Sequence, residues 1–208
     1  MRKKILALGL ILILLCGGAS FIYLRFLVRL VHVPTAAMAN TIVPGDNVII
    51  HKSFGSIERG EVVLFSYPGE SIQYIARVVG LPGETIQIRD KLVFVNDHPL
   101  DEERVFVKPP DVQTQILEEL STEGRGPYRV YVTHSESEMD TDFATMTPFQ
   151  IPRDSYFMLG DDRDNSNDSR YRGPVPRDLI WGSASMIYYS IEKHSGELRS
   201  ERLFKKIR

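Results

Sequence analysis

The hydrophobic pattern changes once along the chain, near residue 27. An uncharged, apolar run spans residues 5–24. At about 1.5 Å per helical residue it is roughly 30 Å long, the thickness of the hydrocarbon core of a bilayer. Beyond it, short runs of β-branched and aromatic residues alternate with Gly, Pro and Asp, which is typical of an all-β domain. The pattern therefore predicts one membrane-anchoring helix followed by a mainly β domain.

Eight segments of the second region have the length and composition of strands. They are residues 47–51, 61–65, 74–79, 85–88, 92–95, 128–133, 155–158 and 181–190. Residues 87–88 and 92–93 flank Arg89-Asp90-Lys91 and are expected to form a hairpin, and residues 95–98 supply the next turn.

The segments between these elements set the expected organisation. We expect a cytoplasmic stub at 1–4, a transmembrane anchor at 5–27, a β domain at 31–100 and 149–192, an insertion at 101–148 and a polar tail at 193–208. The insertion combines a helical-looking segment, 111–120, with strand-like and acidic stretches, so we assign it α+β character. The tail is basic and polar and is expected to be frayed or to lie near the membrane surface.

Charge around the apolar run predicts the orientation in the membrane. Arg2, Lys3 and Lys4 precede the run and favour a cytoplasmic amino terminus with the main domain outside, although Arg25 and Arg29 weaken this contrast. The alternative is a cleavable signal peptide with its small-residue site at 17–19. It is disfavoured because the apolar run continues past that site.

Composition excludes several classes of protein. A net charge of -2 gives no attraction to nucleic acid, and the single cysteine, Cys16, permits no intramolecular disulfide. The five histidines are scattered without the spacing of metal ligands, and no phosphate-binding loop is present. We therefore expect no metal, no cofactor and no nucleic acid partner, and a monomeric chain.

Residues 159–176 are predicted to form a loop that contains four aspartates and three arginines. They read Leu-Gly-Asp-Asp-Arg-Asp-Asn-Ser-Asn-Asp-Ser-Arg-Tyr-Arg-Gly-Pro-Val-Pro. The turn formers and the two prolines exclude a helix interior or a central strand. Alternating Asp and Arg side chains are suited to a hydrogen-bonded site wall, but a salt-bridged surface loop has the same composition.

The motif Gly-Asp-x-Arg-Asp-Asn-Ser-x-Asp-Ser-Arg-Tyr-x-Gly in this loop resembles the carboxy-terminal signature of signal peptidase I. These membrane-bound leader peptidases cut signal peptides from exported proteins. Residues 32–46 resemble the family's first box, Pro-Ser-x-Ser-Met-x-x-Thr-Leu followed by Gly-Asp. Residues 74–83 resemble its second box, Lys-Arg-Val-Val-Gly-Leu-Pro-Gly. The resemblance implies a signal-peptidase-like β domain with a serine–lysine dyad.

The three boxes imply roles for individual residues, and the first two lack the dyad. By the resemblance, Thr35 takes the position of the oxyanion-hole hydroxyl, Met38 that of the pocket methionine and Ser166 that of the lysine-orienting hydroxyl. The nucleophile position is Ala37 and the general-base position is Ala76. A methyl group can neither attack a carbonyl nor accept a proton, so this chain is expected to be inactive.

The third box implies residues that brace the loop. By the resemblance, Asp168 and Arg170 pair with each other, and Asp161 and Arg163 hold the start of the loop. Such pairs fix geometry more reliably than they add stability. Arg172 replaces the aromatic residue usual at its position, so the packing around it is expected to differ.

The family's substrates imply the kind of cleft. Signal peptides are cut after small residues at the first and third positions before the bond, which requires shallow apolar pockets beside an exposed strand edge. Met38, Ile75 and Val78 are the candidate pocket walls, together with residues 33–34. An exposed apolar rim at the bilayer surface is expected from Phe26, Leu27, Leu30 and Phe54.

Three explanations for the two alanines remain open. The chain is an engineered inactive enzyme, a natural member that binds signal peptides or escorts exported proteins without cutting, or an enzyme rescued by other side chains. For rescue, Thr35 and Thr41 offer hydroxyls, and His51 and Lys52 offer bases. A non-enzymatic, membrane-anchored interaction module is the alternative from a different functional class.

Overall fold

The computed structural model describes residues 25–108, 117–133, 145–193 and 195–208, together with residues 9, 14–18 and 20–21. The predicted anchor at 5–27 lies partly outside these residues, as do most of the helical-looking segment and all of the acidic stretch of the insertion. Residues 14–18, 20–21 and 25–27 are helical. Within the described ranges, no helix has the length and apolar character needed to span a membrane.

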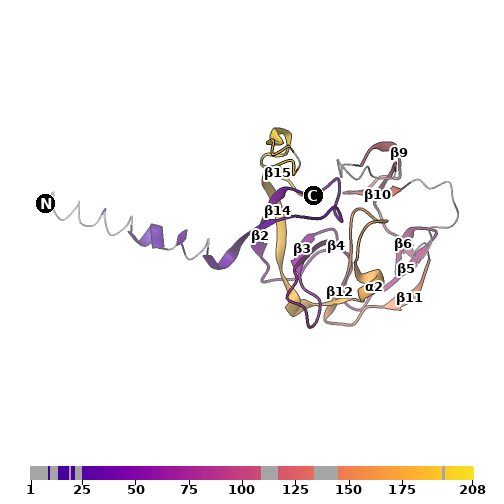
Figure 1. The fold of residues 1–208 in the computed structure, drawn as a ribbon. Coiled ribbons are helices and arrows are strands. Elements are labelled where there is room, and N and C mark those ends of the chain that lie inside the picture. The colour runs from indigo at the N-terminus through magenta and orange to yellow at the C-terminus, as the bar shows by residue number, and fades with distance from the viewer. Residues whose placement is uncertain are drawn as a thin grey trace.

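An eight-stranded antiparallel sheet forms the centre of the fold (Figure 1). Its order is β1 (Val28–His32), β2 (Asp46–Lys52), β14 (Ile180–Ser190), β3 (Val62–Phe65), β4 (Tyr74–Gly80), β12 (Ser155–Leu159) and β13 (Val175–Pro176), with β15 (Lys205–Lys206) paired to β14. The prediction of a mainly β chain is confirmed.

Two smaller sheets adjoin the central one. One has the order β11 (Met146–Gln150), β5 (Thr85–Arg89), β6 (Leu92–Val95) and β7 (His98–Pro99). The other consists of β10 (Arg129–Thr133), β8 (Glu103–Val107) and β9 (Glu119–Glu123), and its β8–β10 pair is parallel. The described helical elements of the domain are short: α2 (Ser169–Arg172), η1 (Arg177–Leu179) and η2 (Ser200–Arg202).

All eight predicted strands occur, with bounds that differ by no more than one residue at either end. The predicted hairpin is also confirmed, since Ile88 pairs with Val93 and Arg89 with Leu92. Its two turn residues, Asp90 and Lys91, have φ values of 49° and 61°. Positive φ at both central positions is the signature of a type I′ turn, whose twist matches that of the flanking strands. The next turn, at 96–97, has the same property.

Several strands were not predicted, and two expectations are wrong. β1 begins one residue after the predicted anchor, in a stretch where no strand was expected, while β9 is exposed along its whole length and so has no hydrophobic alternation. Residues 119–120, expected to be helical, belong to β9. The tail is not frayed over 195–208: it contributes β15 to the central sheet, and Arg202 is buried beside Asp46.

The main hydrophobic core lies against the central sheet, and Val63, Leu64, Ala76 and Val78 belong to it. A second cluster joins Val79 of β4 to residues of β5, β6 and β12. Successive side chains of a strand point to opposite faces, so β4 contributes to both clusters. β4 is therefore held from both faces, and it carries the second of the three sequence boxes.

Gly182 lies where β14 contacts β2 and β3 together, since it is paired with both Lys52 and Leu64. A Cβ atom added there would lie 2.7 Å from the carbonyl carbon of His51 and 2.9 Å from the Cα of Lys52. Both are backbone atoms of a central strand and cannot move aside without shifting β2.

We predict that Gly182→Ala lowers the free energy of unfolding by about 1–3 kcal/mol, because overpacking forces backbone shifts of this size. Urea denaturation followed by circular dichroism measures the change. Gly55→Ala is the matched control: a Cβ at Gly55 meets nothing within 4 Å. Its effect should stay within about 0.5 kcal/mol. Equal effects from the two variants would contradict this account of the β2–β14 contact.

Candidate active site

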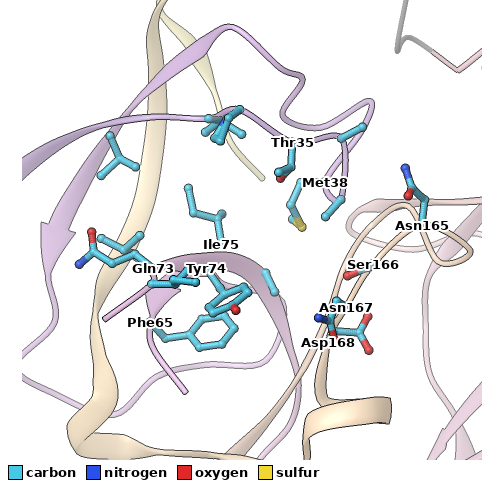
Figure 2. Close-up of a pocket in the computed structure, with 18 of the residues that line it drawn as sticks. Thr35, Met38, Phe65, Gln73, Tyr74, Ile75, Asn165, Ser166, Asn167 and Asp168 are labelled. Carbon is cyan, nitrogen blue, oxygen red and sulfur yellow. The ribbon is translucent and has the colours of Figure 1, made fainter. Parts of the chain in front are cut away.

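A groove of about 800 Å³ brings the three sequence boxes together. It is lined by the loop after β1, by the beginning of β4 and by the segment after β12. Figure 2 shows Thr35 and Met38 of the loop after β1, Ile75 of β4 and Ser166 of the segment after β12 around one opening. Of the residues assigned to the site from sequence, those lining the groove are Thr35, Ala37, Met38, Ile75, Ala76, Ser166 and Asp168.

The first loop is closed at its base by backbone hydrogen bonds. The Val33 amide donates to the carbonyl of Asp46, and the Gly45 amide donates to the carbonyl of Val33, both at 2.9 Å. Between these bonds the chain turns tightly, so that Ala37 reaches the groove while Met38 is buried. The carbonyl of Ala37 accepts from the Asp162 amide at 3.1 Å. The nucleophile position is thus tied through its backbone to the charged loop.

β4 presents an open edge beside the groove. Tyr74, Ile75 and Ala76 pair with β3 on one side. On the other side β12 pairs with β4 only at Arg77, Val78 and Gly80, so in the described chain no strand covers the edge at Tyr74–Ala76. This short stretch has backbone groups available to an extended peptide.

Val78 does not line the groove, so its assignment to the substrate pocket is wrong. It is fully buried in the main core. The reason is its register: Val78 lies opposite Met158 of β12, where that strand has already covered the edge of β4. Ile75, three residues earlier, lies before this pairing begins and does line the groove.

Gly160 allows the third segment to approach the first. A Cβ atom at this position would overlap the Cβ of Ser166 and lie 2.6 Å from the carbonyl oxygen of Ala37. Only glycine leaves room for both neighbours. The backbone of the charged loop therefore lies directly against Ala37, with Ser166 at the groove.

Asp168 organises the end of the same loop. Its carboxylate accepts two bonds from the Arg170 guanidinium, each 2.8 Å, and one from the Gly160 amide at 3.0 Å. It also accepts from the Arg170 amide and so caps α2. Asp168 is 1% exposed, so it is a buried charge whose partners are all local.

Asp161 and Arg163 face different elements. Asp161 accepts from the Nε and Nη2 atoms of Arg77 at 2.8 and 2.6 Å, and from the Thr41 hydroxyl at 2.6 Å. Arg163 donates to both carboxylate oxygens of Glu102. Sequence reasoning missed Arg77 and Glu102. For Arg77 a signal was available, because it directly follows Ala76 in the second box.

Arg172 shows how the chain replaces an aromatic residue. Its guanidinium lies over the rings of Tyr67 and Tyr74, 4.4 and 5.4 Å from their centroids, and it pairs with Glu70. Glu70 also accepts from the Tyr74 hydroxyl at 2.9 Å. Burial raises the pKa of Tyr67 to about 12, so this ring stays neutral at physiological pH. A cation–π cluster therefore occupies the place of the expected aromatic contact.

The groove lacks a nucleophile–base pair of the serine–lysine type. No lysine is present among the described residues that line it. Of the side chains proposed for rescue, Thr35 alone lines the groove. Thr41 donates its hydroxyl to Asp161, and His51 and Lys52 lie on β2 away from the opening.

The protonation of a nearby carboxyl group and the question of a metal site also bear on the chemistry of the groove. Burial raises the pKa of the Asp162 carboxyl to about 6, which the Asn165 side chain offsets only in part, but Asp162 does not line the groove. The described residues contain no cluster of His, Cys, Asp and Glu that could hold a metal ion. The groove presents the backbone groups of the open edge at Tyr74–Ala76 and the hydroxyl groups of Thr35 and Ser166.

The comparisons with known proteins agree on one family. The model for "Signal peptidase, peptidase S26" matches residues 2–189. Signal peptidase I of Pseudomonas aeruginosa is 33% identical over 174 residues, covering 74% of this chain and 60% of the relative. Signal peptidase I of Leptolyngbya laminosa is 29% identical over 210 residues, covering 95% of this chain and 84% of the relative. The chain thus spans 60% of the length of the Pseudomonas protein.

A solved structure is also similar, although distantly. The crystal structure of a signal peptidase I from Enterococcus faecalis is 22% identical, with a TM-score of 0.38, and covers 63% of this chain and 98% of that chain.

The family model covers the three boxes that meet at the groove, from the first loop through the open edge of β4 to the charged loop. Ala37 and Ala76, the two predicted dyad positions, fall within the matched range. This chain belongs to the signal peptidase I family, peptidase S26.

Proposed function

We propose that the groove receives the signal peptides of exported preproteins and that, with alanine at both dyad positions, this chain holds them without cutting. One observation carries the proposal: Thr35, Ala37, Met38, Ile75, Ala76 and Ser166 line a single groove. By the resemblance to the family's boxes, we assign Ala37 to the nucleophile position and Ala76 to the general-base position. The family's reaction, endoproteolysis after small residues, is the activity from which this site derives.

The open edge of β4 supports peptide binding. An extended peptide can add to Tyr74–Ala76 as a further strand, its backbone supplying the hydrogen bonds and its alternate side chains entering pockets. Met38 and Ile75 supply apolar side chains to the wall of the groove, which suits the small side chains of the family's substrates. A hydroxyl donor at Thr35 is placed to contact the peptide carbonyl.

The missing groups support the loss of cleavage. Removing one member of a serine protease triad lowers turnover by up to about a millionfold, since the remaining groups give only residual catalysis. Here both the nucleophile and the base are absent. The substitution leaves the frame of the groove in place, because Ala37 is held through its backbone carbonyl and Ala76 within the β3–β4 ladder.

We further propose a single-pass protein of the cytoplasmic membrane, with residues 5–27 as the anchor, the amino terminus cytoplasmic and the β domain outside. Phe26, Leu30 and Phe54 are more than half exposed, and Ile72 is an exposed side chain at the groove itself. Apolar side chains exposed in this way are suited to a bilayer surface. The proposed unit is a monomer that needs no cofactor.

A second candidate is a membrane-anchored binding or assembly factor for exported proteins that does not use the groove. The two alanines favour it equally, because neither function needs a dyad. The two candidates differ in whether a peptide occupies the groove, and each of the following experiments separates them.

The first prediction concerns cleavage. The double variant Ala37→Ser with Ala76→Lys should cut a preprotein after a small residue in liposomes, whereas the chain as written and both single variants should not. The reason is that serine needs the lysine to accept its proton. Mass spectrometry of the products identifies the bond. Cleavage by the chain as written would instead assign a nucleophile such as Thr35, and a folded but inactive double variant would favour the binding factor.

The second prediction concerns binding. Asp168→Ala should lower the free energy of unfolding by about 3–5 kcal/mol, because it leaves Arg170 as an unpaired buried charge. It should also weaken the binding of a labelled signal peptide at least tenfold, as measured by fluorescence anisotropy in micelles. Asp178→Ala, at an exposed position of η1, is the control and should change neither quantity. A stability loss with unchanged peptide affinity would show that the loop serves the fold alone.

A further inference from the structure

The segment 199–208 packs on the central sheet and its hydrophobic core. β15 pairs with β14 opposite Met186 and Ile187, and the Ile207 amide donates to the carbonyl of Ser185 at 3.0 Å. The Ile207 side chain packs against the main core. This part of the tail is therefore fixed to the central sheet. The backbone that carries Arg199 and Arg202 is held in place by these contacts.

Arg202 binds the turn that closes the first loop. Its Nε donates to Asp46 at 2.9 Å, and its Nη2 donates to the carbonyl of Thr41 at 3.0 Å. Asp46 is fully buried and also accepts from the Val43 amide at 2.9 Å. One guanidinium thus spans both ends of the turn 41–46. Because Arg202 is itself 8% exposed, water cannot replace these bonds without opening the contact.

Arg199 binds the same turn at its middle. Its Nη1 donates to the carbonyl of Pro44 at 2.8 Å, while its other end pairs with Glu192. The next residue, Gly45, has φ of +95°, and a Cβ there would lie 3.3 Å from this guanidinium and 3.2 Å from the carbonyl carbon of Ile191. Glycine therefore lets the tail approach the turn closely.

The turn 41–46 is connected directly to the groove. The Ile42 amide donates to the carbonyl of Met38 at 2.8 Å, and the Thr41 hydroxyl donates to Asp161 at 2.6 Å. The Asp161 amide in turn contacts the sulfur of Met38 at 3.4 Å. A displacement of this turn therefore moves Met38 and the residues before it.

The tail also reaches the other side of Asp161. Arg77, which pairs with Asp161, donates from Nη1 to the backbone oxygen of Arg208 at 2.9 Å. The tail thus contacts both residues that bind the Asp161 carboxylate. Arg202 donates to the carbonyl of Thr41, and the backbone oxygen of Arg208 accepts from Arg77. Buried bidentate pairs of this kind impose geometry as well as energy.

We propose that residues 199–208 position the first loop of the groove, with Arg202 as the positioning residue that sets where Thr35, Ala37 and Met38 lie relative to β4. This inference rests on the proposed function only in taking the groove as the peptide site. Arg202 touches no reacting atom, so it acts on peptide binding and cleavage through the turn 41–46.

The test uses the full chain labelled with ¹³C at the methionine methyl groups. The Met38 resonance, assigned by its loss in Met38→Leu, should shift or broaden in Arg202→Gln. It should move back toward its original position in Arg202→Lys, which restores the charge. Arg177→Gln is the matched control: Arg177 is a half-buried arginine that donates to the carbonyls of Ser53, Gly55 and Ile180 and contacts none of the turn. The control should leave the Met38 resonance unchanged.

A second readout follows peptide handling. Arg202→Gln should weaken signal-peptide binding to the chain as written at least fivefold. In the Ala37→Ser, Ala76→Lys background it should lower kcat at least tenfold with KM changed less than threefold. A shifted Met38 resonance without peptide binding by any variant would contradict the proposed function and leave the positioning role supported.

An unchanged Met38 resonance in folded Arg202→Gln would overturn the proposal, even if the variant melts at a lower temperature. If Arg202→Gln does not fold, Arg199→Gln replaces it, since Arg199 contacts the same turn through the Pro44 carbonyl and leaves the pair between Arg202 and Asp46 intact. A shift of the Met38 resonance in Arg199→Gln then supports the proposal, and an unchanged resonance overturns it.

Discussion

The buried ion pair between Arg77 and Asp161 is the contact on which the groove depends. It joins β4, one residue after Ala76, to the start of the charged loop, and the two side chains are 1% and 0% exposed. Burying two charges costs several kcal/mol unless every remaining donor and acceptor finds a partner. Here Thr41 completes Asp161, while the carbonyl of Gly60 and the ring of Tyr128 complete Arg77. The pair therefore permits few arrangements of the three boxes.

The contacts that hold the three boxes together do not involve polar side chains at positions 37 and 76, the predicted dyad positions. Ala37 contributes a carbonyl to the charged loop, and Ala76 contributes backbone pairing with β3 and a methyl group to the main core. A serine and a lysine would add chemistry without being needed for assembly. The contacts that hold the groove together therefore place few demands on the side chains at positions 37 and 76. The same property makes the groove a suitable place in which to introduce a serine and a lysine.

Sequence patterns predicted the strands well because alternation and turn chemistry are local. Asp90 and Lys91, for example, mark a tight hairpin without reference to any other part of the chain. The charged contacts were harder to predict, since their partners lie far apart in sequence: Asp161 is 84 residues from Arg77, and Arg202 is 156 residues from Asp46. Family resemblance located the site residues but not these partners. It also misplaced Val78, because strand identity alone does not reveal where β12 begins to cover β4.

The open edge of β4 also bears on solubility. Unpaired strand edges are the usual starting points for aggregation, since they can template pairing with a strand from another molecule. In this chain the exposed stretch is three residues long, Tyr74–Ala76, and it is recessed between the first loop and the charged loop that line the same groove. The edge of a second folded sheet needs a longer unobstructed stretch than these three residues between two loops. The flanking loops thus limit the tendency of this edge to self-associate.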